Sequence, residues 1–445
     1  MSTIIYPITN LKTGTDMSVV RGEGVYVYDD QGKQYLEGMS GLWCTALGYG
    51  NQELVQTAAQ QMTDLSYSSM FFGKTHPVGE ALAEKLAAMA PVERPHMFFG
   101  NSGSDANDTQ LKILRYYFNA IGKPNKKKVI ARQRSYHGIT MGSACLTGLE
   151  VNHTNFDLPV EALGILRTDA PFYYRDRLEG ETESQFVDRI LGNLEAMIVR
   201  EDPETIAAFI AEPITGASGV IVAPDGYYQK LRALLAKYDI FFIADEVITG
   251  FGRTGNAFGC ETMSIGAPDM MSVAKQLSSA YQPISAAIVR GDIYDALVEP
   301  SNRIGVFGHG YTYSCHPVAA AVALKTLEIY ERDNIFGIAA ETGDYFQQQL
   351  KTFATHSIVG EVRGRGLMAA VELQNHARGE AFPLAVSDFL RRACLEEGLI
   401  LRDVGTAIAF CPPLIITRTQ IDDLLARFGR ALDKTAAWVE QEGLL

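Results

Sequence analysis

The feature that most constrains the fold of this 445-residue chain is a series of short, nearly all-apolar runs that alternate with amphipathic segments. These runs occupy residues 129–131, 205–210, 240–244 and 270–274. Strands that are apolar at every position are typical of a parallel sheet with helices over both faces. Their alternation with helical segments predicts an α/β fold.

Signals on either side of these runs predict two domains. The sequence GVYVYDDQGKQYLEG predicts a hairpin with its turn at 29–32. We expect a large domain over 61–325 with a mostly parallel sheet, and a smaller α+β domain formed jointly by 1–60 and 326–445. Helices are expected over 51–65, 78–89, 319–331, 336–353 and 421–441, and strands over 96–99 and 362–373.

Composition argues against several classes of function. A formal net charge of −13 argues against nucleic-acid binding, which favours a basic surface. The six cysteines form no CxxC pair, and only Cys315 adjoins a histidine, so no metal site is predicted. No apolar run approaches the ~20 residues of a membrane helix, and no secretory signal is visible. We therefore expect a cytoplasmic enzyme with no membrane partner.

Three of the predicted strands end on ionisable residues. TIAAFIAEP leads to Glu212, YDIFFIADEV to Asp245 and DMMSVAK to Lys275. Each charge taken alone could simply reach solvent at a strand end. Because ligands of open α/β sheets bind beyond the carboxyl ends of the strands, the three together predict a site for a charged ligand.

A buried lysine beside a carboxylate suits pyridoxal-5'-phosphate (PLP). Desolvation lowers the pKa of a lysine and frees its amine to attack a carbonyl. PLP requires such a lysine, together with a carboxylate that keeps its pyridine nitrogen protonated. Lys275 and Asp245 are the natural candidates for these two groups.

Two glycine-rich segments could bind phosphate. The turn GNSGS at residues 100–104 precedes a predicted helix, where free N–H groups and hydroxyls favour an anion, although many such turns are only helix caps. GFGRTG at 250–255 matches a dinucleotide-binding pattern. The segment after it is too short and too rich in glycine and proline for the crossover helix that pattern requires, so we prefer the first segment.

Nearly the whole chain resembles the class III aminotransferases, which are PLP enzymes of the aspartate-aminotransferase fold (fold type I). The resemblance is closest to their ω-amine:pyruvate branch. The matching motifs are SGLWCTALGYG, GNSGSDAND, SYHG, FIAEPITGASGV, FIADEVITGFGRTG, AKQLSSAYQP, FGHGYTYSCHP and LRDVGTAIAFCPPLIIT.

The resemblance implies a role for each matching residue. Lys275 is the catalytic lysine, which holds PLP as a Schiff base and moves the proton, and Asp245 pairs with the pyridine nitrogen. Tyr136 and Val247 cover the two faces of the ring, Thr312 reaches the phosphate of the partner subunit, and Arg402 binds the substrate carboxylate. The remaining implied residues are Ser102, Gly103 and Ser104 at the phosphate, His137 and Glu212 beside the cofactor, and Trp43, Phe72 and Tyr136 along the amine pocket.

Some of these residues have an alternative interpretation. By sequence alone, the aromatic residues Trp43, Phe72 and Tyr136 could equally be ordinary core residues. His137 and His309 are expected to be structural rather than catalytic, because the lysine already supplies the base.

Differences from other class III enzymes indicate which keto acid accepts the amino group. Relatives that use 2-oxoglutarate carry a glutamate where Ala217 stands and a glutamine where Ile248 stands. Both differences favour pyruvate. Cys315 replaces a usual glycine and Phe172 a frequent histidine, and the sequence explains neither.

We therefore expect an aminotransferase that moves an amino group from a primary ω-amine or ω-amino acid to a keto acid, by a PLP/PMP ping-pong mechanism. The resemblance implies a homodimer, or a tetramer, with shared active sites. The alternatives are a transaminase specific for γ-aminobutyrate, β-alanine or taurine, a PLP-dependent lyase on the same fold, and a binding protein without catalysis. The sequence does not identify the amine donor.

Overall fold

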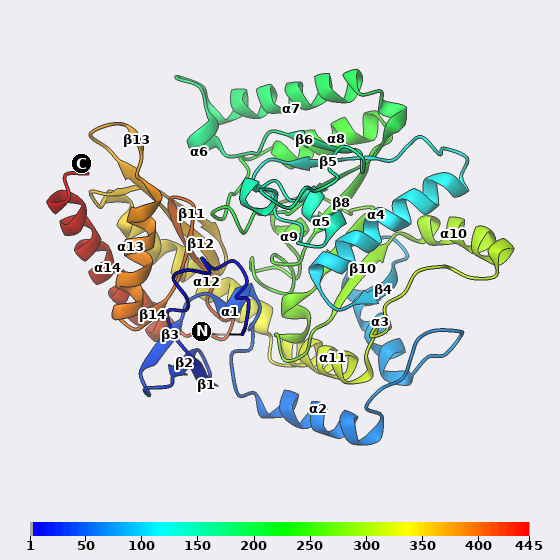
Figure 1. Cartoon of the computed structure of the whole chain (residues 1–445), viewed down its shortest axis with the longest axis horizontal. Coiled ribbons are helices and arrows are strands. Elements are labelled where there is room, and N and C mark those ends of the chain that lie inside the picture. Colours follow the sequence, from blue (N-terminus) through cyan, green and yellow to red (C-terminus); the bar gives the residue numbers. More distant parts are fainter. Residues whose placement is uncertain (1–2, 445) are drawn as a thin grey trace.

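The computed structural model describes residues 3–444, and a seven-stranded sheet forms its centre (Figure 1). The strand order is β4–β10–β9–β8–β7–β5–β6. Strand β10 pairs antiparallel with both neighbours, whereas the pairs from β9 to β6 are parallel, so the mostly parallel sheet is confirmed. The strands are β4 (His96–Gly100), β5 (Lys128–Arg132), β6 (Ile165–Thr168), β7 (Ile206–Ala211), β8 (Phe241–Asp245), β9 (Met270–Val273) and β10 (Ser285–Val289).

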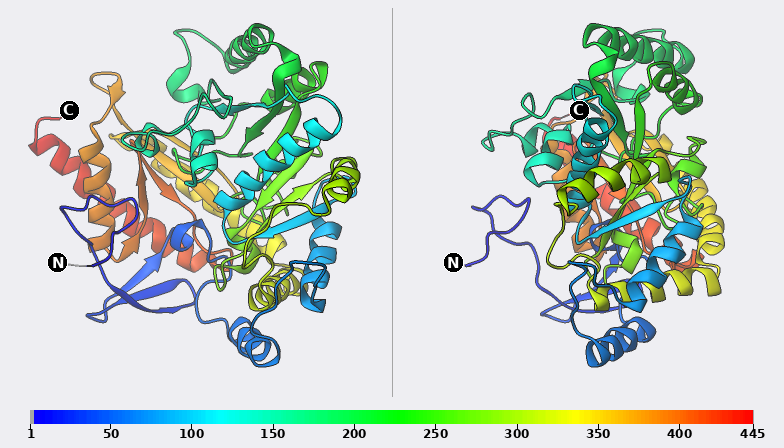
Figure 2. Two further views of the ribbon diagram at one scale, coloured as in Figure 1. Left: turned by 45° about the vertical axis from the view of Figure 1, so that its right-hand side comes forward. Right: turned by 90° about the vertical axis from the view of Figure 1, so that its right-hand side faces the viewer.

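Helices cover both faces of this sheet, which explains why its strands are apolar throughout (Figure 2). In β8, for example, Phe241 and Ile243 enter one core while Phe242 and Ala244 enter the other. One face packs against α4 (Gly103–Ala120), α5 (Met141–Leu146) and α10 (Gly291–Ile304), and the other against α3 (Pro77–Met89), α7 (Glu183–Arg200), α8 (Tyr227–Lys237) and α11 (Pro317–Arg332).

The two ends of the chain share a second body, on the left of Figure 1. In its first sheet, C-terminal β14 (Leu399–Ile400) pairs parallel with N-terminal β3 (Gln34–Glu37). The other strands of that sheet are β1 (Val19–Glu23) and β2 (Tyr26–Asp29), and the second sheet contains β11 (Val359–Arg365), β12 (Met368–Asn375), β13 (Glu380–Ala381), β15 (Arg402–Val404) and β16 (Ala407–Phe410). Helices α12 (Ile335–Leu350), α13 (Leu384–Glu396) and α14 (Arg418–Gln441) complete it.

The predicted domain boundaries fall inside two helices that pack against each other. The boundary at 60/61 lies within α2 (Gln52–Asp64), and the boundary at 325/326 lies within α11. The division into 61–325 and its flanking segments stays a prediction.

One expected strand is in fact a hairpin. Residues 362–373 were predicted as a single strand, but β11 and β12 pair antiparallel across a turn at Gly366 and Leu367. Gly366 has a φ of +54°, in the left-handed region that glycine adopts at little cost. The reversal takes only two residues, Gly366 and Leu367, so the run lacks the cluster of turn residues that usually separates two strands.

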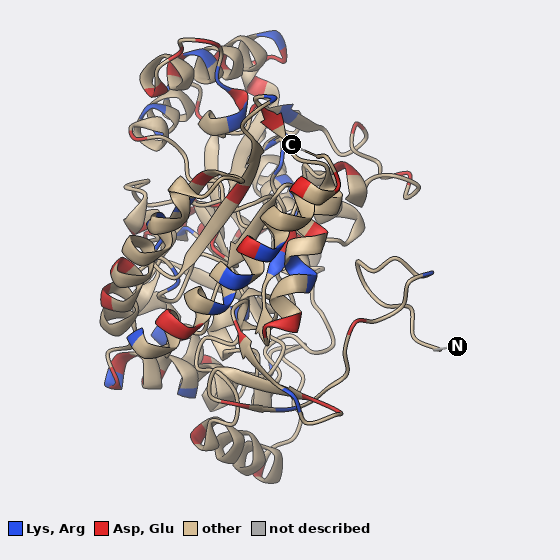
Figure 3. Ribbon diagram, turned by 90° about the vertical axis from the view of Figure 1, so that its left-hand side faces the viewer, with Lys and Arg blue, Asp and Glu red and all other residues tan. Residues whose placement is uncertain are grey.

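Acidic and basic residues alternate along the helices and loops of the ribbon in Figure 3. Many of them form ion pairs at the surface, such as Arg391 with Asp388 and Lys434 with Glu396. Within residues 3–444, no helix is both long and apolar enough to cross a membrane.

The tight packing at Gly366 gives a test of the fold. A Cβ at this position would lie 2.6–2.8 Å from backbone atoms of Thr254 and Arg253. Gly379 is the matched control, because its φ is +69° and a Cβ there would meet nothing within 4 Å. Gly379→Ala should destabilise the protein by about 1 kcal/mol through backbone strain alone. Gly366→Ala should cost about 1–3 kcal/mol more, because packed backbone must move. Urea unfolding measures both, and equal losses would contradict the packing.

Candidate active site

The three charged strand ends meet at one edge of the central sheet. Strands β7, β8 and β9 are adjacent and parallel, so their carboxyl ends lie side by side. Glu212, Asp245 and Lys275 all line a single cavity of about 460 Å³ at this edge. The sequence-based prediction of a charged site beyond the strand ends is therefore met.

Asp245 is buried and held entirely by hydrogen-bond donors. Its Oδ2 accepts from Asn107 Nδ2 at 2.8 Å and lies 2.8 Å from His137 Nδ1. Its Oδ1 accepts from the backbone N–H of Val247 at 3.2 Å. His137 therefore helps to position Asp245, which agrees with its expected structural role. These contacts fix the carboxylate in place, as a partner for a protonated ring nitrogen requires.

Lys275 presents an amine free of competing partners. It lies two residues after the end of β9, and its backbone φ of +47° is unusual for a non-glycine residue. Within the described chain its Nζ makes no hydrogen bond or ion pair. Burial lowers the pKa of Lys275, which raises the fraction of neutral, nucleophilic amine.

The turn at 100–104 brings the N-terminus of α4 to the other end of the cavity. The hydroxyl of Ser102 caps the helix by accepting the N–H of Asp105 at 3.2 Å. The N–H groups of Gly103 and Ser104 have no acceptor within the helix and can bind an anion. A Cβ on Gly103 would lie 3.0 Å from Val247, so only glycine leaves that side chain in place.

Glu212 acts on the cavity through the backbone of its neighbours. Its Oε1 accepts the N–H of Tyr136 at 2.9 Å, and its Oε2 accepts the N–H of Gly216 at 2.8 Å. Burial raises the pKa of Glu212. The carboxylate thereby positions Tyr136, which lines the cavity together with Val247.

A wider chamber of about 820 Å³ adjoins the first cavity and shares Tyr136, Ile248 and Lys275 with it. Trp43 and Arg402 line this chamber, as predicted. The segment LRDVG, which lies between two apolar runs, suggests a turn at Arg402, but the structure places Arg402 in a strand. It begins β15 and pairs with Ala409. Across residues 3–444, its guanidinium forms neither an ion pair nor a hydrogen bond, and burial lowers its pKa.

The structure does not bring Phe72 and Thr312 to the chamber of their own chain. Phe72 is 91% exposed and Thr312 is also exposed. The two loops that carry them lie together, because Tyr67 Oη donates to the carbonyl of Thr312 at 2.9 Å and Gly310 lies against Phe71. The prediction that Phe72 lines the pocket therefore fails within one subunit.

Sequence reasoning missed Asn107 and Leu42. Asn107 Nδ2 donates both to Asp245 and to the carbonyl of His137, at 2.8 and 2.7 Å. Its spacing of four residues from Gly103 places it on the same helix face, a signal that could have revealed it. Leu42 lines both cavities, and nothing in its sequence context distinguishes it from a core leucine.

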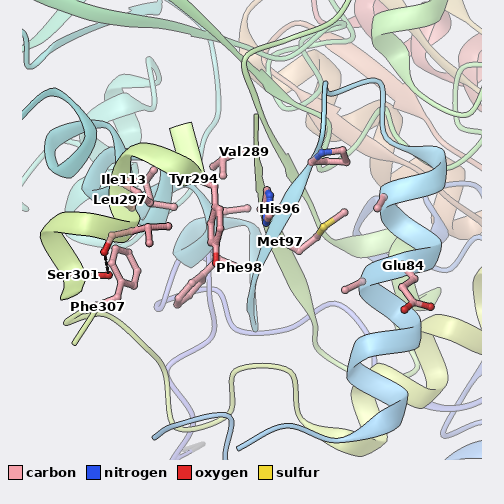
Figure 4. Close-up of a pocket in the computed structure, with 15 residues that line it drawn as sticks. Glu84, His96, Met97, Phe98, Ile113, Val289, Tyr294, Leu297, Ser301 and Phe307 are labelled. Carbon is pink, nitrogen blue, oxygen red and sulfur yellow. Dashed lines mark hydrogen bonds between the residues drawn. The ribbon is translucent and has the colours of Figure 1, made fainter. Parts of the chain in front are cut away.

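A third cavity, of about 600 Å³, lies between α3 and α10 (Figure 4). Met97, Phe98, Leu297 and Phe307 make it largely apolar, and His96 stacks on Tyr294 with ring centroids 3.8 Å apart. None of the predicted site residues lines it. Among residues 3–444, no cluster of His, Cys, Asp or Glu could hold a metal ion.

The GFGRTG segment joins parts of the fold rather than binding a nucleotide. The buried Arg253 donates to the carbonyls of Leu367 and Pro412, at 3.1 and 2.5 Å. Only a four-residue helix, α9 (Gly259–Thr262), follows it. The crossover helix of a dinucleotide site is therefore missing from this part of the chain.

Cys315 and Phe172 gain partial explanations. Cys315 has a φ of +51°, which accounts for glycine being usual there. Phe172 lines the wide chamber and lies under Arg363, 4.6 Å from the ring centroid.

The first cavity has the features that PLP requires. An anion site lies at the α4 N-terminus, Asp245 supplies a fixed carboxylate, and Lys275 supplies a free amine. The family model for class-III aminotransferases matches residues 9–432. This chain is a class III aminotransferase.

Individual relatives agree with this assignment. The chain is 46% identical to a probable γ-aminobutyrate transaminase 2 of rice, Oryza sativa subsp. indica, covering 97% of this chain and 88% of the relative. An ω-transaminase of Pseudomonas jessenii, solved in complex with PMP, is 47% identical, with a TM-score of 0.95 over 98% of this chain and 97% of that one. A structure described as a transaminase with L-Ala is 46% identical, with a TM-score of 0.93 over 95% of this chain and 100% of that one.

The aminotransferase thus has the fold-type-I α/β architecture and uses PLP. Ser102, Gly103 and Ser104 would hold the phosphate, and Tyr136 and Val247 would flank the ring. The individual roles of these residues stay predictions.

The role of Lys275 can be tested by reductive trapping. Borohydride added to the yellow holoenzyme should fix the cofactor on the peptide that contains Lys275, because only this amine lies free in the cavity. Lys275→Ala should abolish trapping and turnover. Lys230→Ala, which removes a surface lysine paired with Asp188, is the control and should change neither. Full turnover by Lys275→Ala would refute the assignment.

Proposed function

We propose that this aminotransferase transfers an amino group from a primary ω-amine or ω-amino acid to pyruvate by a ping-pong mechanism. Both substrates would use the chamber that contains Lys275, Trp43 and Arg402 in turn. The amine donor can be apolar beyond its nitrogen, whereas pyruvate carries a carboxylate.

The unpaired guanidinium of Arg402 is the observation that carries this proposal. A fixed, buried cation would penalise an apolar donor, and the absence of a cation would penalise pyruvate. A long arginine side chain without a fixed partner can serve both, by turning toward a carboxylate and away from an apolar group. Its planar fork matches a carboxylate with two charge-assisted hydrogen bonds. Ala217 lines the same chamber and offers no carboxylate to hold Arg402 away.

The residues of this chain divide the chemical work. Bound PLP would supply an electron sink for the substrate carbon that loses its proton. Lys275 Nζ would take that proton and deliver it to the cofactor side. Asp245 would keep a proton on the ring nitrogen, and the tight packing of Tyr136 and Val247 would exclude water from the ring.

The comparisons support the choice of substrates. One relative is named a γ-aminobutyrate transaminase, and γ-aminobutyrate is an ω-amino acid. Another similar structure is described with L-alanine, which is the product formed when pyruvate accepts an amino group. Specificity for γ-aminobutyrate therefore remains the second candidate.

We further propose a homodimer with shared sites as the active unit. Phe72 and Thr312 are both exposed on adjoining loops and contribute nothing to their own chamber. A second copy placed against these loops would receive both side chains, and whether dimers pair into tetramers is open.

We also propose a cytoplasmic location, which suits the six unpaired cysteines.

The arginine proposal predicts unequal losses in the two half-reactions. Arg402→Ala should slow the pyruvate half-reaction about 10²- to 10⁴-fold, because two charge-assisted hydrogen bonds of ~1.5–3 kcal/mol each are lost. The single-turnover rate with an amine donor that has no carboxylate, such as a phenylalkylamine, should stay within about tenfold of the wild-type rate. Stopped-flow absorbance measures each half-reaction separately.

Arg134→Ala is the matched control for this experiment. Arg134 lines the same chamber but is paired with Asp176 at 3.2 Å. Its loss should affect the pyruvate half-reaction far less than the loss of Arg402. Equal losses in both half-reactions of Arg402→Ala, or no loss in either, would argue against the moving arginine.

Sharing of sites predicts complementation between two inactive variants. A dimer of one Lys275→Ala and one Thr312→Ala protomer would have one doubly damaged site and one intact site. Mixing the two should therefore restore activity, up to half of the wild-type value per hybrid dimer. No gain, with hybrids confirmed by native mass spectrometry, would count against the sharing of sites through Thr312.

A further inference from the structure

The segment that carries Leu42 and Trp43 into the substrate chamber has a strained backbone. Ser40, Gly41 and Trp43 have φ values of +48°, +63° and +64°. Two of these three residues are not glycine, so the conformation must be held by its surroundings. Trp43 is 1% exposed and packs with Ile214, while Leu42 projects between the two cavities.

Glu37 holds this segment from one side. It is the last residue of β3 and is 5% exposed. Its Oε1 accepts the N–H of Met39 at 2.9 Å. The N–H of Gly41 faces the carboxylate closely enough to lower its pKa. Tyr49 Oη lies 3.5 Å from its Oε2. The carboxylate thus binds the backbone before Ser40 and faces the backbone after it.

Ser40 is held from the other side. Its Oγ donates to the carbonyl of Cys411 at 2.6 Å, and Arg253 donates to the same Oγ at 3.3 Å. The segment is therefore clamped between a buried carboxylate and the GFGRTG turn.

A contribution to the stability of the folded state does not explain why Glu37 is buried here. Within residues 3–444 it forms no ion pair, and a buried carboxylate without a cation is costly to keep charged. Burial raises the pKa of Glu37 to about 7, so ionising it at neutral pH works against folding. What its charge does provide is a strong acceptor for the N–H of Met39 and an attraction for the N–H of Gly41, both beside the chamber.

We propose that Glu37 is a positioning residue that sets substrate selectivity by holding Leu42 and Trp43 against the chamber. This inference rests on the proposed amine specificity. When the carboxylate loses its charge, its grip on the N–H groups of Met39 and Gly41 weakens. The wall formed by Trp43 then becomes mobile, and large aryl amines lose their fit before small ω-amino acids do.

Glu37 is the group in its surroundings that titrates near neutral pH. The ionisable side chains that face it are Tyr49, Cys44 and Cys411. Burial raises the pKa of the Cys411 thiol to about 11 and raises the pKa values of Cys44 and Tyr49 as well. All three stay neutral at pH 7. Beyond the thiols lie the cationic groups of Arg253 and Lys275.

The first test is the ratio of kcat/KM for 1-phenylethylamine to that for γ-aminobutyrate, measured from about pH 6 to about pH 8.5. Both donors stay protonated over this range, so their own titration cancels in the ratio. In wild type, the ratio should rise on the order of tenfold as the pH rises, with a midpoint near the pKa of Glu37. The reason is that ionised Glu37 fixes the chamber wall formed by Trp43, which is loosely held at low pH. In Glu37→Gln it should be flat and equal to the low-pH value of wild type.

Glu246→Gln is the matched control. Glu246 is also fully buried and accepts two backbone N–H groups, those of Gly259 and Cys260 at 2.9 and 2.7 Å, but these do not touch the chamber. It should lower stability without changing the ratio or its pH dependence. A pH-independent ratio in wild type, or the same change in both variants, would overturn the proposal.

A second test needs neither cofactor nor activity. The chain has two tryptophans, and Trp438→Phe removes the one on α14, leaving Trp43 as the reporter. Acrylamide quenching of the apo-protein should increase about twofold or more on going from about pH 8.5 to about pH 6. Adding Glu37→Gln should make quenching high at both pH values.

The two tests separate the failure of this inference from the failure of the proposed function. If no amine is transaminated but the quenching titrates as expected, Glu37 holds the segment and the substrate assignment is wrong. If quenching in the Trp438→Phe protein does not change with pH, Glu37 does not hold the segment, whatever the activity. If Glu37→Gln fails to fold, quenching of the Trp438→Phe protein alone decides.

Discussion

The active site depends on the parallel pairing of three buried strands. Because β7, β8 and β9 run in the same direction and lie side by side, their carboxyl ends deliver Glu212, Asp245 and Lys275 to one edge. Helices must then cover both faces of the sheet, and one of them, α4, points its N-terminus at the same edge. The anion site, the carboxylate and the amine are thus consequences of one sheet geometry.

Three buried charged residues near the site are held by hydrogen bonds to backbone groups and polar side chains. Asp245 is held by Asn107, His137 and a backbone N–H, and Glu37 by the N–H of Met39. Arg253 donates to carbonyl oxygens. Elsewhere in the fold, buried charges form ion pairs, as Glu372 does with Arg175 and Arg363. Fixed hydrogen-bond donors and acceptors orient the charged side chains at the site.

A single chain gives an incomplete account of the substrate chamber. Trp43, Tyr136 and Arg402 line it, but Phe72 and Thr312 lie on exposed loops away from it. The contact between those loops gives one surface that presents both residues outward. In the homodimer that we propose, these two residues would lie at the site of the partner subunit.

The sequence by itself determined the elements whose signal is local. Apolar runs gave the strands of the parallel sheet, because burial on both faces removes the polar alternation of exposed strands. The charged residues that end those runs gave the candidate lysine and carboxylates, because parallel strands end together. The tertiary structure alone decided the rest. The hairpin at Gly366 was hidden because its turn has only two residues, and Arg402 proved to be a strand residue rather than a turn residue. The contact of Arg253 with Ser40 and the partnership of Asn107 with Asp245 join residues distant in sequence. No local pattern encodes such contacts, because they arise only when separate elements pack together.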